Sequence, residues 1–160
     1  MQLDFINKLN MVKIIRGNKK MELNKLYDVA AKENISIIDF RMKNKAIIEL
    51  IDKEYYIGLN YSKIVHSTEE KELLAEELGH YYTNTLYNHN YSNEEIRKRE
   101  YRANKWKLKA LVPYSKLKEL YEKGIRCTYE FAEELGVSEN LINTAYNYYK
   151  EDLCLEELVI

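Results

Sequence analysis

Residues 74–83 read Leu-Ala-Glu-Glu-Leu-Gly-His-Tyr-Tyr-Thr, and this is the most informative stretch of the chain. Ser67-Thr68-Glu69-Glu70 precedes it and has the pattern of a capping box. In such a box a Ser at the N-cap and a Glu three residues later each bond the other's backbone N–H group. We therefore predict a helix that begins at Ser67, carries the whole stretch, and runs to about residue 85.

A second capping box, Ser92-Asn93-Glu94-Glu95, opens the next predicted helix. We expect this helix to end before Pro113, because the residue before a proline disfavours helical geometry. Three shorter helices should follow, over residues 115–123, 128–135 and 138–151, with Gly124 and Gly136 at the breaks between them.

Upstream of the motif, one helical pattern precedes several short β-branched runs. Apolar residues at helical spacing predict an amphipathic helix over residues 21–33. Residues 35–40 suit a strand, and the apolar runs 46–51 and 55–59, separated by Asp52-Lys53-Glu54, suit a hairpin. The predicted fold class is therefore α+β, with a small antiparallel three-stranded sheet followed by a helical C-terminal half.

Length and composition limit the classes of function. A chain of 160 residues, 46% of them apolar, fits a single domain over 1–160, with a core at 21–113 and C-terminal helices at 114–160. The net charge of -1 gives no electrostatic case for nucleic acid, and no apolar run approaches the roughly 20 residues that span a bilayer. Cys127 and Cys154 lack metal-type spacing, so we expect reduced thiols and a cytoplasmic protein without nucleic-acid or membrane partners.

Glu76, Glu77 and His80 carry the candidate chemistry. Metal-binding helices of zinc peptidases read His-Glu-x-x-His, in which two ligands four residues apart point the same way and the Glu can hold the attacking water. Glu76 takes the first ligand position, Glu77 the base position and His80 the second ligand position, within about 100° of helix arc. Because Glu-rich helices are common on protein surfaces, a solvated helix face remains the alternative interpretation of these residues alone.

Two blocks together resemble the ImmA/IrrE family of metallo-endopeptidases. The first is residues 74–83, and the second is EYRANKW at 100–106 followed by ALVP at 110–113. In that family the second block has a Glu, an Ala-Asn pair, an aromatic residue and a closing Leu-x-Pro at these offsets. Its Glu supplies the third metal ligand, and the resemblance therefore gives this role to Glu100. The likeness spans about residues 21–150 and implies a zincin-like domain with a zinc cofactor.

Glu76 departs from the family pattern, which has a His at this position. A carboxylate can bind zinc, at oxygen–metal distances of about 2.0–2.2 Å, so the predicted ligands are Glu76, His80, Glu100 and a water. Two carboxylates cancel the charge of a divalent cation, whereas a His-His-Glu set leaves about one positive charge. We therefore expect weaker zinc binding or slower hydrolysis than the His form gives, and a shift toward harder metals such as Mn or Fe.

The two other histidines are candidates for a substitute ligand. His66 lies about 20 Å before His80 along the same predicted helix, at 1.5 Å per residue, which is too far to replace the missing His. His89 lies in the loop between the two ligand helices, and a loop can fold back toward the site.

The tail carries a separate pattern at residues 132–142 that looks like a helix-turn-helix unit, with Gly136 in the turn and Ser138 as the cap. A DNA-reading helix needs basic groups for phosphates, but Lys150 is the only basic residue between 139 and 151. We therefore interpret the tail as a structural helix pair or as a surface that recognises a protein.

The leading hypothesis is a zinc-dependent metallo-endopeptidase in which Glu77 is the catalytic base. The resemblance implies a protein substrate, namely a helix-turn-helix transcriptional repressor of a phage or other mobile element, so that the chain would act as an anti-repressor. One alternative is a catalytically inactive relative, without metal, that binds a regulator. The other, less favoured, is a helix-turn-helix DNA-binding protein.

Overall fold

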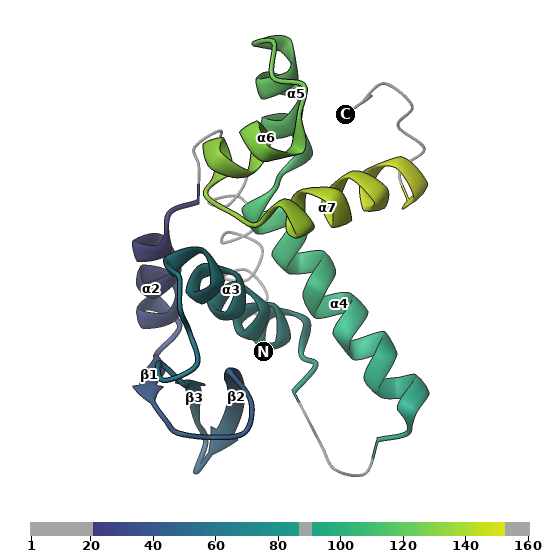
Figure 1. Cartoon of the computed structure of the whole chain (residues 1–160). Coiled ribbons are helices and arrows are strands. Elements are labelled where there is room, and N and C mark those ends of the chain that lie inside the picture. Colours follow the sequence, from purple (N-terminus) through teal and green to yellow (C-terminus); the bar gives the residue numbers. More distant parts are fainter. Residues whose placement is uncertain (1–20, 87–90, 153–160) are drawn as a thin grey trace. The chain divides into compact units, whose positions relative to one another are not determined.

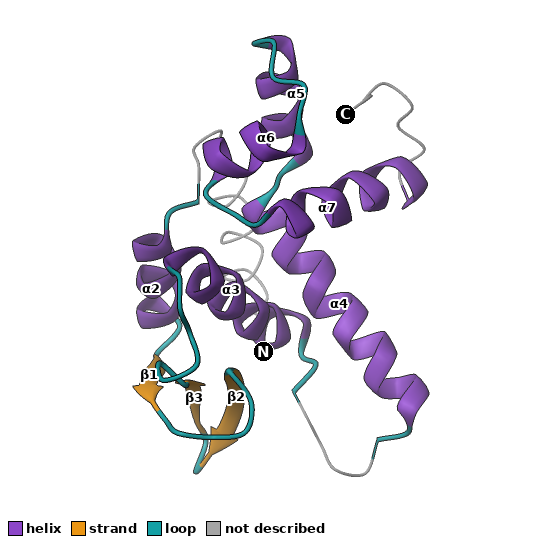
Figure 2. Ribbon diagram, viewed as in Figure 1, coloured by secondary structure: helices purple, strands orange, loops and turns teal. Residues whose placement is uncertain are grey.

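The computed structural model describes residues 21–86 and 91–152 (Figure 1). These residues fall into two compact units. The unit Glu22–Lys107 holds α2 (Leu23–Lys32), β1 (Ile35–Asp39), β2 (Ala46–Ile51), β3 (Glu54–Leu59), α3 (Ser67–Thr83) and most of α4 (Asn93–Leu111). The other unit, over its described residues 108–152, holds the end of α4 and then α5 (Tyr114–Glu122), α6 (Thr128–Leu135) and α7 (Glu139–Asp152). A sheet followed by helices confirms the α+β class (Figure 2).

The three strands form one mixed sheet in the order β1-β3-β2. β2 and β3 form the predicted hairpin, and its two turn residues, Asp52 and Lys53, have the positive φ angles (49° and 71°) that a tight type I′ turn requires. β1 pairs with β3 in parallel, so the prediction of a wholly antiparallel sheet is wrong. The reason is topological: the chain passes from β1 to the far edge first, and β3 then returns between them in the direction of β1.

Helices α2 and α3 pack on one face of the sheet and bury its inward side chains (Figure 1). The buried apolar residues of this unit include Leu26, Ile48, Ile57, Leu59, Leu74 and Leu78. Each such side chain contributes about 1.5–3 kcal/mol on burial, so the sheet and the two helices stabilise one another. α3 contacts β2 directly, so the residues of α3 that face this edge strand have fixed positions.

The capping box predicted at residues 67–70 does not form. The N-cap residue of α3 is His66, and it makes no side-chain hydrogen bond to the helix. Glu70 is engaged by the hydroxyl group of Tyr27 on α2, so its carboxylate does not reach back to the start of its own helix. Glu70 therefore bonds Tyr27, from another helix, in place of the backbone at the start of α3.

The capping box at the start of α4 does form. The Ser92 N–H donates to Glu95 Oε2 at 2.9 Å, and the Glu95 N–H donates to Ser92 Oγ at 3.3 Å. α4 then runs to Leu111, two residues before Pro113, as the proline rule predicts. This long helix is the element that carries Glu100.

The helices of the second unit enclose an apolar core that includes Leu111, Leu117, Phe131, Leu135 and Ile142. Gly136 ends α6 in the left-handed conformation (φ 59°), and Ser138 Oγ accepts a hydrogen bond from the Leu141 N–H at 3.2 Å. The predicted turn and cap of the tail are therefore confirmed. No helix among the described residues combines the length and the apolar composition that crossing a membrane requires.

Candidate metal centre

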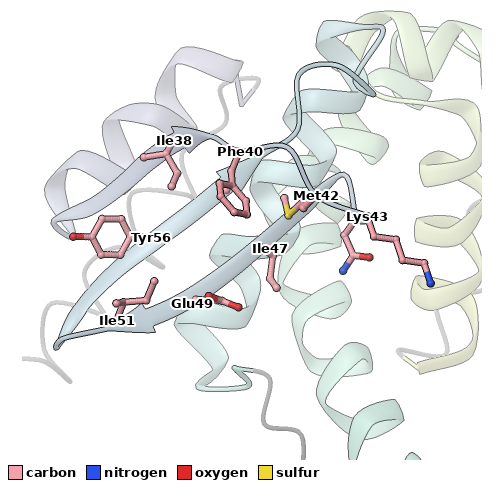
Figure 3. A pocket seen from close by; sticks show the side chains of 10 residues that line it. Ile38, Phe40, Met42, Lys43, Ile47, Glu49, Ile51 and Tyr56 are labelled. Carbon is pink, nitrogen blue, oxygen red and sulfur yellow. The ribbon is translucent and has the colours of Figure 1, made fainter.

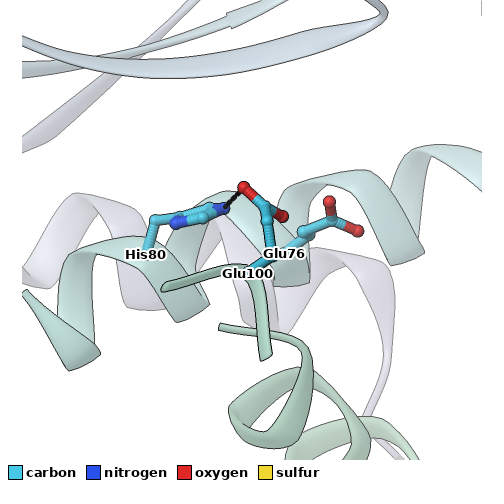
Figure 4. A group of neighbouring side chains, drawn as sticks. All are labelled: Glu76, His80 and Glu100. Carbon is cyan, nitrogen blue, oxygen red and sulfur yellow. Dashed lines mark ion pairs between the residues drawn. The ribbon is translucent and has the colours of Figure 1, made fainter. Parts of the chain in front are cut away.

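The structure brings Glu76, His80 and Glu100 together from two helices (Figure 4). α3 carries Glu76 and His80 one turn apart, and α4 brings Glu100 beside them. One potential ligand atom from each residue lies within 4.8 Å of the other two, and His80 Nε2 is 3.6 Å from Glu100 Oε1. One imidazole and two carboxylates are donors that Zn²⁺ and Mn²⁺ accept, so this set fits a divalent cation.

Gly79 allows α4 to approach α3 this closely. A Cβ atom at this position would lie 2.6 Å from the carbonyl oxygen of Ala103, a distance that real Cβ atoms do not reach. On the same two helices Trp106 stacks on Tyr82, with 5.0 Å between ring centroids and 15° between planes. The glycine thus serves tight helix packing, and this packing sets Glu100 opposite the α3 ligands.

His80 is buried, and Thr85 fixes the orientation of its ring. α3 ends at Asn84 in the left-handed conformation (φ 54°), and the Thr85 N–H returns to the His80 carbonyl at 2.9 Å, a Schellman-type end. The Thr85 carbonyl and Oγ1 lie 3.1 Å and 3.0 Å from His80 Nδ1. Because a carbonyl oxygen only accepts, Nδ1 is the nitrogen that donates here, and in the neutral ring the lone pair is then on Nε2, which faces Glu100. This is the tautomer of a metal-binding histidine.

Glu77 lies next to these donors and is only 7% exposed. The backbone N–H of Ile48 on β2 donates a hydrogen bond to its carboxylate. Burial first, and then the negative charges of Glu76 and Glu100, raise the pKa of Glu77 to about 8 from its ordinary 4.5. A carboxyl group that exchanges its proton near neutral pH has the property that a general base needs.

Lys107 is a member of the cluster that the sequence analysis missed. It is buried, and its Nζ atom lies 2.5 Å from Glu76 Oε2. Lys107 follows Glu100 by seven residues, about two helical turns, so both side chains leave the same side of α4. That spacing was visible in the sequence, but lysines on charged helices are ordinarily solvated and gave no reason to choose this one.

A cleft of about 890 Å³ opens beside these groups. Its lining comprises residues 44–50 around β2, together with Leu73, Glu76, Glu77, His80, Leu86, Tyr91 and Ile96. β2 is an outer strand of the sheet, so one edge of its backbone has no strand partner among the described residues. Such an edge, next to a reactive centre, suits an extended peptide that adds to the sheet.

A second hollow of about 490 Å³ lies on the opposite face of the sheet (Figure 3). Its walls are mainly apolar, with Ile38, Phe40, Ile47 and Ile51 among them, and Glu49 is its only acidic side chain. Among the residues that the structure describes, Glu76, His80 and Glu100 are the one group of three potential metal ligands. The candidate chemistry therefore belongs to the cleft beside β2.

His66 does not join this group. His66 precedes α3, at the end of the helix opposite to His80, and is exposed. His89 lies outside the described residues.

Comparison with known protein families settles the affiliation. A model of peptidase family M78, described as the IrrE N-terminal-like domain, matches residues 30–146. The chain belongs to the IrrE N-terminal-like family. No curated protein and no solved structure matches the chain significantly. Membership confirms the resemblance seen in the two sequence blocks, supports a metallopeptidase-like function, and implies protein substrates.

Proposed function

We propose that this chain is a metal-dependent endopeptidase whose metal ligands are Glu76, His80 and Glu100. The observation that carries the proposal is the convergence of these donors from two helices, within 4.8 Å of one another, beside a peptide-sized cleft. The hydrogen bond from Nδ1 of His80 to the Thr85 carbonyl supports it, because in the neutral ring this bond leaves the Nε2 lone pair facing the carboxylate of Glu100. Zinc is the proposed metal, and Mn or Fe also suits a donor set with two carboxylates.

Glu77 is the proposed general base. A divalent cation held by the three ligands would supply Lewis-acid polarisation of the scissile carbonyl and would make water more acidic. Glu77 takes a proton from the attacking water as its oxygen bonds to the carbonyl carbon, and it passes that proton to the leaving amine as the C–N bond breaks. The Ile48 N–H holds the Glu77 carboxylate in place for both transfers.

The proposed substrate is a protein segment in extended form, aligned along β2. The open edge of this strand and the Glu77 carboxylate border the same cleft, so main-chain hydrogen bonds would place a peptide bond near the base. The family resemblance suggests a helix-turn-helix repressor of a phage or mobile element as the protein that is cut, which gives the chain an anti-repressor role.

Metal analysis is the first test of this function. Protein purified without chelator should contain close to one equivalent of Zn, Mn or Fe, or should take it up on titration. Glu100→Gln removes one ligand charge and should weaken this uptake. A full chain that neither contains nor binds any of these metals would refute the proposal.

Cleavage is the second test, with the helix-turn-helix repressor encoded nearest to this chain as the probe. Glu77→Gln keeps the shape of the side chain and the acceptor for the Ile48 N–H but cannot take up a proton. We expect it to bind metal as the wild type does and to cut about 10²–10⁴-fold more slowly. Fragments that form at the wild-type rate in Glu77→Gln would exclude Glu77 as the base.

A second candidate function is a catalytically silent protein that binds a regulator without cutting it. The observation that favours it is the ion pair between Lys107 and Glu76, because a lysine ammonium already neutralises the first ligand. This candidate predicts a stable complex with the repressor that survives chelator and yields no fragments. Metal-dependent fragments in the same mixture would contradict it.

A further inference from the structure

The Lys107–Glu76 pair lies inside the carboxylate cluster rather than on the protein surface. The Lys107 side chain is 11% exposed and the Glu76 side chain 30%, compared with 67% and 75% for the Lys98–Glu94 pair on the same helix. Surface pairs such as the latter contribute little, because water already solvates both charges. A buried ammonium group is costly unless a carboxylate offsets its charge, so Lys107 and Glu76 depend on each other.

The charge of Lys107 also acts on the rest of the cluster. Glu76, Glu77 and Glu100 bring three carboxyl groups close together. The negative charges of Glu76 and Glu100 are part of what raises the pKa of Glu77. The Lys107 ammonium opposes that effect on Glu77 while it binds Glu76 directly. It therefore neutralises the same negative potential that would attract a divalent cation.

We propose that Lys107 is the built-in counter-cation of this cluster and that it sets the affinity of the site for metal. The inference rests on the proposed metal centre. Its ammonium holds the carboxylates together when no metal is bound, and it lowers the affinity for a divalent cation by competing for Glu76 and by repelling the incoming charge. Two carboxylates and a divalent cation sum to zero, so Lys107 restores the single positive charge that a neutral ligand at position 76 would leave.

The direction in which metal affinity changes when Lys107 is replaced distinguishes this role from simple packing. A residue that only supports the fold or orients Glu76 would, when replaced, leave metal binding unchanged or weaker. A competing cation predicts the opposite, namely tighter metal binding, together with a less stable protein in chelator because three carboxyl groups lose their counter-ion. No purely structural role predicts both changes at once.

The test compares the full-length wild type with Lys107→Met, which keeps most of the side-chain volume and removes the charge. Calorimetric titration with Zn²⁺ and with Mn²⁺ should show at least tenfold tighter binding by the variant, and its melting temperature in EDTA should be lower. Lys98→Met, which removes the exposed pair with Glu94, is the matched control and should change neither quantity. If Lys107→Met does not fold, Lys107→Gln replaces it and should show the same two changes.

The outcomes distinguish this inference from the proposed function. Metal affinity that is unchanged or weaker in the folded Lys107 variants, while the wild type binds metal, overturns the role of Lys107 and leaves the metal centre intact. Absence of metal uptake by the wild type and by every variant overturns the metal centre and the role of Lys107 with it. Tighter binding by Lys107→Met and no change in Lys98→Met supports the inference.

Discussion

The two units of the chain bury different kinds of side chains. In Glu22–Lys107 the interior contains polar and charged residues as well as apolar ones: Asn60, Lys71, Glu77, His80, Thr85 and Lys107. In residues 108–152 every buried side chain is aliphatic or aromatic, with Tyr148 and Tyr149 the only ones that carry a hydroxyl group. The first unit therefore buries charged side chains, whose burial costs the most free energy, and the described residues of the second unit bury none.

This difference indicates where the function lies. Buried ionisable groups lower stability unless they are paired, and they persist mainly where their chemistry is used. Four of the six buried polar residues belong to the proposed metal centre or contact it. His80 is a proposed ligand and Glu77 the proposed base, Lys107 pairs with Glu76, and Thr85 hydrogen-bonds His80. The helices of the second unit instead enclose an ordinary apolar core, which contributes stability.

The largest predicted effect is on the stability of the second unit, residues 108–152, which has the apolar core. Phe131 is fully buried, so Phe131→Ala should lower the free energy of unfolding by about 3–5 kcal/mol through lost burial and a new cavity. Denaturant unfolding measures the loss, and titration with Zn²⁺ below the unfolding transition should still give the wild-type affinity. A fall in metal affinity as large as the fall in stability would show that the two units do not divide the roles in this way.

Gly79→Ala should affect the unit Glu22–Lys107. We expect a smaller loss of stability than in Phe131→Ala, together with a loss of metal affinity at the proposed site. The new Cβ would meet the Ala103 carbonyl oxygen at 2.6 Å, so α4 must move and take Glu100 away from His80. Overpacking of this kind costs about 1–3 kcal/mol, and calorimetry should show weaker metal binding.

Gly58→Ala is the matched control for Gly79→Ala in the same unit. Its added Cβ makes only ordinary contacts, at 3.5 Å from Met42 and Phe40 and 3.6 Å from Ile47. Metal affinity should therefore stay at the wild-type value. An equal loss in both variants would mean that general destabilisation, and not the spacing of α3 and α4, controls the site.

Much of the fold was predictable because its signals are local. The β2–β3 hairpin, the break at Gly136 and the cap at Ser138 each depend on a few neighbouring residues, and all three are present. The parallel pairing of β1 with β3 was not predictable in this way, because it depends on which strand the chain reaches first after residue 39. The residues at 67–70 and 92–95 have the same capping pattern, yet only the second forms, because Tyr27 takes the Glu70 carboxylate.

The residues of the candidate site also differ in whether a local sequence signal identifies them. Glu76 and His80 are close in sequence and the family resemblance points to Glu100, so the three residues that lie together can be selected from the sequence. Lys107 is 31 residues from Glu76, and no local pattern marks a lysine as the partner of one particular glutamate. Thr85 contacts His80 only because α3 ends at Asn84, one turn after the motif.

The smallest predicted effect concerns this last contact. Thr85→Val keeps the size of the side chain and the backbone carbonyl that accepts from His80 Nδ1, but it removes the Oγ1 atom at 3.0 Å. Loss of one of the two acceptors should let the ring turn and should weaken metal binding by about tenfold, at the low end for residues that orient a ligand. Calorimetric titration with Zn²⁺ measures the change, and Thr85→Ser, which keeps the hydroxyl group, should retain most of the affinity. If Thr85→Ser loses affinity and Thr85→Val does not, packing of the methyl group and not the hydrogen bond to Oγ1 orients His80.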